Sequence, residues 1–235
     1  IVIGVNTNKI ESFNQSWLSN FIGLCQQTAH ILWPLALGYG AIYLFLRVAF
    51  TVYHFDKLQG ISASGWLSLY LNGLRFDLAA LSPFLLLFFL VSFISAPQIR
   101  RFFWWIVGAS ALLFILLNGA DVVLSGFTGR RFSKSSLVLV GEGSWKNLLD
   151  YTVMASFTGV FLVIGFLISK ISLIRLENRA HQKNFFGRLI LSALALIVFV
   201  VMARGGLQLK PISHVDAKVI DHQLAHQVVL NSTFT

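Results

Sequence analysis

Residues 78–99 read LAALSPFLLLFFLVSFISAPQI, a run of 22 residues without a charged side chain. As an α-helix this run is about 33 Å long, which matches the roughly 30 Å hydrocarbon core of a lipid bilayer. A helix on the surface of a soluble protein needs a polar face, and this run has too few polar residues to form one. The stretch therefore predicts a transmembrane helix.

Four further apolar runs have the length and composition of membrane spans. The whole chain is 56% hydrophobic and 11% charged, whereas soluble domains average roughly 25% charged residues. We therefore predict an all-α polytopic membrane protein. Residues 1–203 form its transmembrane domain, with five spans near residues 29–50, 78–99, 102–124, 151–173 and 186–203.

The basic charge indicates how these spans are oriented. The net charge is +9, and residues 100–101 and 170–188, at the turns between spans two and three and between spans four and five, carry seven Lys and Arg against one acid, Glu177. Basic residues in short loops favour the cytoplasmic side. We expect a cytoplasmic N-terminus, residues 204–235 outside, and attraction to anionic lipid headgroups rather than to nucleic acid.

The connection between the first two spans holds an aromatic and leucine-rich stretch around Trp66 and Tyr70. Trp and Tyr favour the headgroup region, so we predict an interfacial helix here, and a second one in the connection between spans three and four. Arg75 and Asp77 follow at the start of the second span. They are costly in lipid, and two interpretations are open: they face each other or a polar cavity, or they snorkel to the interface with no further role.

Charged residues recur wherever the predicted topology reaches the outer face. Arginine presents a planar fork of donors that fits a phosphate diester, so this set is a candidate phospholipid headgroup site or a docking surface for another domain. The alternative is ordinary contact with outer-leaflet lipid and ion pairing among these residues. The candidates are Arg75, Asp77, Asp121, Arg130, Arg131 and Arg204.

Two histidines in the tail, His222 and His226, are spaced to share one face of a helix. They are candidate metal ligands, but the glutamate of a His-Glu-x-x-His site is missing, which favours solvated or packing histidines. No phosphate-binding glycine loop and no Gly-x-Ser-x-Gly elbow occurs. No catalytic residue is therefore assigned in this chain.

Two motifs carry a resemblance to a known family. Gly73-Leu-Arg-Phe-Asp-Leu at the second span and Arg204-Gly-Gly-Leu-Gln-Leu-Lys-Pro after the fifth, with Asn231 near the end of the tail, resemble the membrane region of the lipoteichoic acid synthase-like proteins. These are bacterial membrane enzymes of the alkaline phosphatase and sulfatase superfamily. Their pattern is five spans, a connecting segment and a large extracytoplasmic catalytic domain.

The resemblance implies that this chain is the anchor of a metal-dependent enzyme of the bacterial inner membrane. Such an enzyme transfers phosphoglycerol or phosphoethanolamine, or hydrolyses a sulfate ester, with a divalent cation such as Mn²⁺ or Zn²⁺. The nucleophilic threonine and metal ligands of the family belong to a catalytic domain that this chain does not contain. The implied partners are that domain and anionic membrane phospholipid.

The alternative is a non-enzymatic membrane protein, such as a transporter subunit, a sensor or an assembly partner. A transporter is expected to have polar or broken helices at mid-membrane depth. Pro34 in the first span and Pro83 in the second are signals of that kind. The charged residues cluster at the span ends instead, which favours the anchor.

Overall fold

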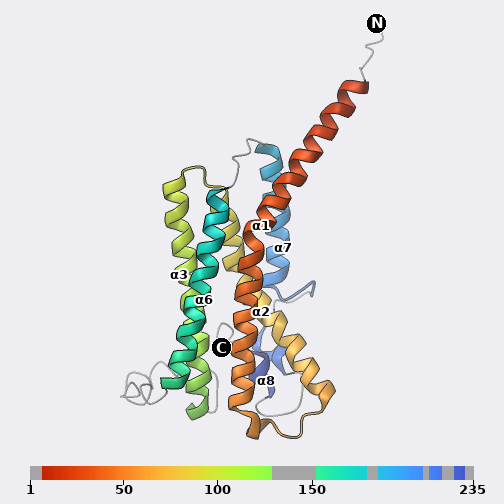
Figure 1. Ribbon diagram of the computed structural model, residues 1–235. Coiled ribbons are helices and arrows are strands. Elements are labelled where there is room, and N and C mark those ends of the chain that lie inside the picture. The colour runs from red at the N-terminus through yellow and green to blue at the C-terminus, as the bar shows by residue number, and fades with distance from the viewer. Residues whose placement is uncertain (1–6, 129–151, 179–184, 209–211, 219–224, 231–235) are drawn as a thin grey trace.

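The computed structural model is a bundle of long helices (Figure 1). It describes residues 7–128, 152–178, 185–208, 212–218 and 225–230, and these residues contain helices and turns but no strand. The five long helices are α1 (Thr7–Tyr53), α2 (Ala63–Ser92), α3 (Pro97–Thr128), α6 (Thr152–Glu177) and α7 (Phe185–Ala203). Short helices follow at η1 (Phe55–Leu58), η2 (His214–Ala217) and α8 (Ala225–Val229).

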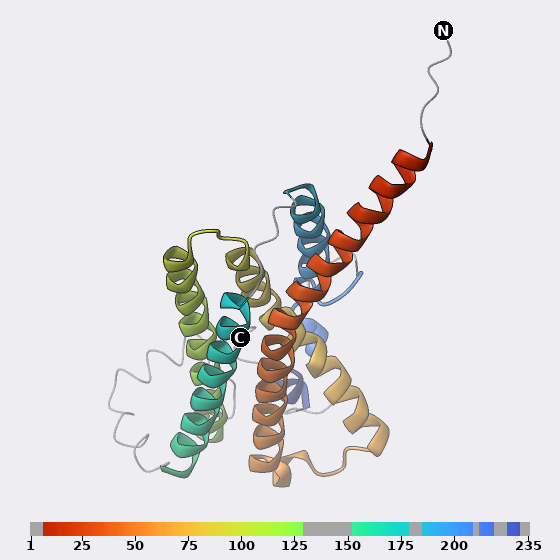
Figure 2. The same ribbon diagram turned by 45° about the horizontal axis from the view of Figure 1, so that its top comes forward.

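All five long helices are apolar and long enough to cross a membrane, as their sequences predict. They alternate in direction, so that α1 and α3 end, and α2 and α6 begin, at the same end of the bundle (Figures 1 and 2). The tail that follows α7 folds at this end too, and we call it the tail face. The opposite end, where α2 ends and α3 begins, is the N-terminal face.

Helix α1 is much longer than its predicted span. Its 47 residues amount to about 70 Å, roughly twice the thickness of a hydrocarbon core. Figures 1 and 2 show the first part of α1 projecting beyond the other helices at the N-terminal face. The predicted span, residues 29–50, is the part that packs within the bundle.

The helix that contains most of the second predicted span has different limits from that span. Helix α2 begins fifteen residues before residue 78 and stops at Ser92, and residues 93–96 form a turn. Pro97 then opens α3; proline is favoured in the first turn of a helix because its missing N–H has no partner there in any case. The side chain of Ser62 caps the start of α2, because its Oγ accepts a hydrogen bond from Gly65 N at 3.2 Å.

The predicted interfacial helix around Trp66 is the first part of α2 rather than a separate element. Figures 1 and 2 show this part leaning outward at the tail face, with α8 lying between it and α1. The second predicted interfacial helix, in the connection after α3, lies outside the described residues.

Aromatic and aliphatic side chains from α1, α2, α3 and α6 form the main core. At its centre a polar cluster links three helices. Tyr39 Oη lies 2.8 Å from Ser169 Oγ, and Trp104 Nε1 donates to Ser169 O at 3.1 Å. Lipid tails are as apolar as the helix side chains, so the hydrophobic effect does not drive membrane helices together. Hydrogen bonds of this kind help to hold them together instead.

A second, smaller core lies at the tail face. It packs one side of the first part of α2 against the tail, and its buried members are Leu69, Phe76, Ala79, Ile212, Ala217, Ala225, Val229 and Leu230. The described part of the predicted connecting segment is thus folded onto the membrane helices.

Candidate functional site

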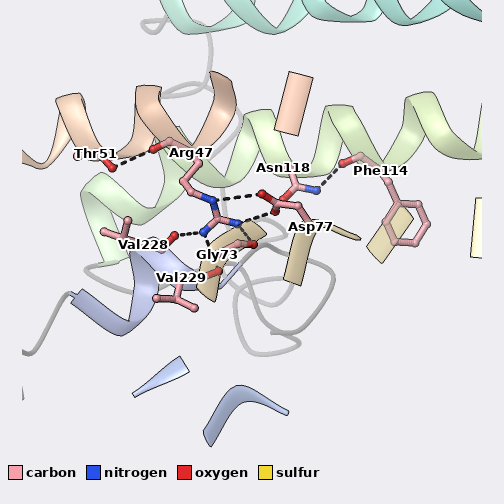
Figure 3. Close-up of polar contacts among 8 residues, drawn as sticks. All are labelled: Arg47, Thr51, Gly73, Asp77, Phe114, Asn118, Val228 and Val229. Atoms are coloured by element: carbon pink, nitrogen blue, oxygen red, sulfur yellow. Dashed lines mark hydrogen bonds and ion pairs between the residues drawn. The ribbon is translucent and has the colours of Figure 1, made fainter. Parts of the chain in front are cut away.

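The most conspicuous polar contact in the bundle is a buried ion pair between α1 and α2. Arg47 Nη2 lies 2.5 Å from Asp77 Oδ1, and Arg47 Nε donates to Asp77 Oδ2 at 3.2 Å (Figure 3). Each side chain is only 2% exposed. The two-pronged geometry uses the planar fork of the guanidinium group, which is the strongest arrangement an arginine makes with a carboxylate.

The remaining N–H groups of Arg47 donate to backbone carbonyls. Nη2 donates to Gly73 O at 2.8 Å, and Nη1 donates to Val229 O at 2.7 Å and also to Val228 O. All five N–H donors of the guanidinium therefore have an acceptor. A buried charge is tolerated only when it is paired and hydrogen-bonded in this way.

Two of these acceptors belong to α8, so Arg47 ties the tail to the transmembrane helices. The α8 side chains support the contact, because Val228 packs with Phe50 of α1 and Val122 of α3, while Val229 packs with α2. Carbonyl groups at the end of a helix lack intrahelical partners and carry partial negative charge, which suits a cation. We call Arg47, Asp77 and the two α8 carbonyls the clasp.

Gly73 makes room for the clasp. A Cβ at this position would collide with the guanidinium group of Arg47. The glycine of the Gly73-Leu-Arg-Phe-Asp-Leu motif therefore has a steric role, and its carbonyl is one of the five acceptors.

A second arginine holds the turn that follows α7. Arg75 Nε donates to Gly205 O at 3.1 Å and Nη2 donates to Gln208 Oε1 at 2.9 Å. Arg204 Nη2 donates to the backbone oxygen of Gln208 at 3.2 Å, and Gln208 Nε2 returns a bond to Arg204 O at 3.1 Å. The side chain of Gln208 thus links the two arginines.

The Gly205-Gly206 pair forms a fixed turn. Both residues have positive φ, 75° and 131°, a conformation that glycine adopts without strain. Their N–H groups donate to Met202 O and Val201 O, which closes the end of α7 in the manner of a Schellman cap. A Cβ on Gly205 would lie 2.8 Å from Ile212 Cβ.

Asp121 and Asn118 of α3 are also buried at the tail face, at 0% and 3% exposure. Asn118 lines a small cavity beside the clasp and donates to Phe114 O at 2.9 Å (Figure 3). The cavity has room for about one water molecule. It is too small to hold a phospholipid headgroup.

The structure separates the residues that the sequence grouped together. Asp77 does not face Arg75, because residues two apart on a helix point in different directions; it faces Arg47 and the small cavity instead. Arg75 contacts the turn after α7, and Arg130 and Arg131 lie outside the described residues. Of the interpretations left open for Arg75 and Asp77, mutual contact is therefore not what the structure shows, and Asp77 lines the small cavity instead.

Only one of the two histidines of the tail belongs to the described residues. His226 lies on α8, and His222 lies outside the described part of the chain. Among the described residues, no group of three His, Cys, Asp or Glu side chains is placed to hold a metal ion.

Sequence reasoning missed Arg47, which is the centre of the site. The signal was present, because a lone arginine inside a predicted span is expected to have a specific partner within the protein. Which acid it pairs with depends on how α1 and α2 pack, and this is not encoded in either segment alone.

Comparison with known proteins gives no relative for this arrangement. No family model, no curated protein and no solved structure matches the chain.

Proposed function

We propose that this chain is the membrane anchor of a bacterial envelope enzyme and that it holds the segment after α7 against the outer face of the cytoplasmic membrane. Five helices long and apolar enough to cross a membrane supply the anchor. The clasp and Arg75 supply the attachment, because each joins the tail to helices that precede it by more than 125 residues. The tail face is the extracytoplasmic face, as the charge distribution favours.

One observation carries the proposal. The two motifs that resemble the lipoteichoic acid synthase-like proteins contact each other: Arg75 of the first motif donates to Gly205 and Gln208 of the second. Asp77 of the first motif belongs to the clasp, and Gly73 of the same motif accepts a hydrogen bond from Arg47. Both motifs thus serve one task, which is to fix the exit of the chain from the membrane.

The enzyme class follows from the resemblance. The anchor would position a metal-dependent catalytic domain that transfers phosphoglycerol or phosphoethanolamine from a membrane lipid, or hydrolyses a sulfate ester. Holding such a domain at the interface raises the effective concentration of a substrate whose headgroup stays there. The Mn²⁺ or Zn²⁺ ion would be bound by that domain, since the described residues of this chain offer no ligand set.

The test uses the product of the complete natural gene in membranes that contain phosphatidylglycerol or phosphatidylethanolamine labelled in the headgroup. Transfer breaks the bond between the phosphorus atom and the diacylglycerol oxygen, so we expect loss of headgroup label from lipid, release of diacylglycerol, and arrest by a chelator. Two results would each contradict the proposal. One is a gene product without a soluble metal-binding domain, and the other is membranes that show neither headgroup turnover nor sulfate ester hydrolysis.

A further inference from the structure

A leucine stripe runs along the outward side of the first part of α2. Leu67, Leu71, Leu74 and Leu78 follow at intervals of four, three and four residues, so they share one helix face. All four are exposed, from 63% at Leu67 to 40% at Leu78. The opposite side of the same turns is buried against the tail, and the stripe continues without a break into the part of α2 that is predicted to cross the membrane.

Arg75 lies at the edge of this stripe, four residues after Leu71 and three before Leu78. It is exposed, and its three acceptors are neutral oxygens: Gly205 O, Gln208 Oε1 and Asn72 Oδ1. The ion pairs among the described residues, Arg47–Asp77 and Arg101–Glu177, leave Arg75 out. Its positive charge is therefore held in place but is not neutralised by any described carboxylate.

Within the described part of the chain, two of the five N–H groups of Arg75 have no acceptor, one on each terminal nitrogen. The side-chain amide of Gln208 accepts from Arg75 and donates to the backbone oxygen of Arg204, and the Arg204 guanidinium donates to the backbone oxygen of Gln208, so both guanidinium groups contact the same residue at the tail face. Beside them, Leu207 is 91% exposed. Two cations next to exposed leucines match a ligand that carries an anion at one end and hydrocarbon at the other.

We propose that Arg75 and Arg204 bind the phosphodiester of one resident phospholipid, whose acyl chains cover Leu71, Leu74, Leu78 and Leu207. The inference rests on the proposed function in that the tail face must lie at a membrane surface. It adds a lipid that is bound and not consumed, and that completes the joint between α2 and the turn after α7. Recognition is through the phosphodiester and the chains, so phosphatidylglycerol and phosphatidylethanolamine both fit.

The competing interpretation is that Arg75 serves only to dock the tail. Gln208→Glu separates the two. This substitution keeps the size of the side chain and gives Arg75 an ion pair, so it preserves the contact between Arg75 and the tail, although the bond from Gln208 Nε2 to Arg204 O is lost. It also places a carboxylate beside the guanidinium group of Arg75, where it competes with a phosphodiester. Arg101→Ala, which removes an exposed arginine at the N-terminal face, is the matched control.

The experiment titrates the purified chain in a neutral detergent and counts bound lipid by native mass spectrometry. The probes are dioleoyl phosphatidylglycerol, dioleoyl phosphatidylethanolamine, dioleoylglycerol and sn-glycerol 3-phosphate. We expect one tight site for both phospholipids. Affinity should fall about tenfold or more in Gln208→Glu and in Arg75→Ala, which corresponds to about 1.4 kcal/mol or more, and it should be unchanged in Arg101→Ala. Dioleoylglycerol and glycerol 3-phosphate should each bind at least about tenfold more weakly.

Equal phospholipid binding by the wild type and Gln208→Glu would overturn the proposal. Equal binding of dioleoylglycerol would show that the acyl chains alone are recognised, and equal binding of glycerol 3-phosphate would show a site for free phosphate esters; each result overturns the lipid assignment. These measurements do not depend on headgroup turnover, so the resident lipid and the enzymatic proposal succeed or fail separately.

Discussion

Arg47 and Asp77 face each other across the contact between α1 and α2, with both side chains buried and Nη2 and Oδ1 2.5 Å apart. The same guanidinium group donates to two carbonyls of α8. One side chain therefore joins three parts of the chain, namely the end of the first span, the second span and the tail. This arrangement makes the fold at the tail face depend on a single charge.

Removing one member of the pair is expected to be severe. Arg47→Ala leaves Asp77 buried without its partner, and we expect a loss of about 3–5 kcal/mol in the free energy of unfolding. The double variant Arg47→Met with Asp77→Leu removes both charges and should recover most of this loss. Unfolding in mixed detergent micelles measures both values. A double variant as unstable as the single one would show that the ion pair, or the bonds from Arg47 to the α8 carbonyls, supplies the stability.

Gly73→Ala tests the steric role of the glycine. The new methyl group would collide with the guanidinium of Arg47, so we expect a loss of about 1–3 kcal/mol. Gly40→Ala in α1 is the control, since a Cβ there has no neighbour within 4 Å and alanine favours the helix. The two variants are compared by thermal unfolding in the same detergent. If Gly73→Ala proves as stable as Gly40→Ala, the close packing around Arg47 is incorrect.

Arg75→Ala should loosen the turn after α7 without unfolding the bundle. The variant removes the donors to Gly205 O and Gln208 Oε1, while the main core lies elsewhere. We expect faster amide hydrogen exchange in residues 205–208 and unchanged exchange in residues 31–46 of α1. Unchanged exchange in the turn would mean that the glycine cap alone fixes it.

The orientation is tested with single cysteines. Cys25 is the only native cysteine, so a Cys25→Ser chain accepts one probe at Val215, which is 68% exposed in the tail, or at Ile22, which is 46% exposed near the N-terminal face. A membrane-impermeant maleimide added to intact cells with a permeable outer membrane should label Val215→Cys but not Ile22→Cys. The reverse pattern would invert the proposed topology.

The sequence was sufficient to predict five apolar helices, because a helix that faces lipid needs no alternation of polar and apolar residues. It did not reveal their ends. The first part of α2 contains Asn72 and Gly73, and the first part of α1 is polar, so neither extension resembles a span. The turn at residues 93–96 was hidden inside a run of apolar residues and is marked only by Pro97.

The sequence was sufficient to select Arg75 and Asp77 as candidate residues, but it did not reveal their partners. Asp77 and Arg75 were singled out because charges are rare in spans, yet each has a partner that only tertiary packing selects. Asp77 pairs with Arg47 of another helix, and Arg75 donates hydrogen bonds to the turn after α7. The spacing of Arg75 and Asp77 was enough to exclude their contact, since residues two apart do not share a helix face.

The most direct test of the clasp asks whether α8 is held against the bundle by Arg47. In the Cys25→Ser chain, Val229→Cys places a small thiol on α8 at a side chain that is 0% exposed, and Val215→Cys is the exposed reference. The rate of maleimide labelling in detergent is measured for both. The account predicts slow labelling at residue 229, fast labelling at residue 215, and fast labelling at residue 229 once Arg47→Ala is introduced. Equal, fast labelling at both positions in the presence of Arg47 would contradict it.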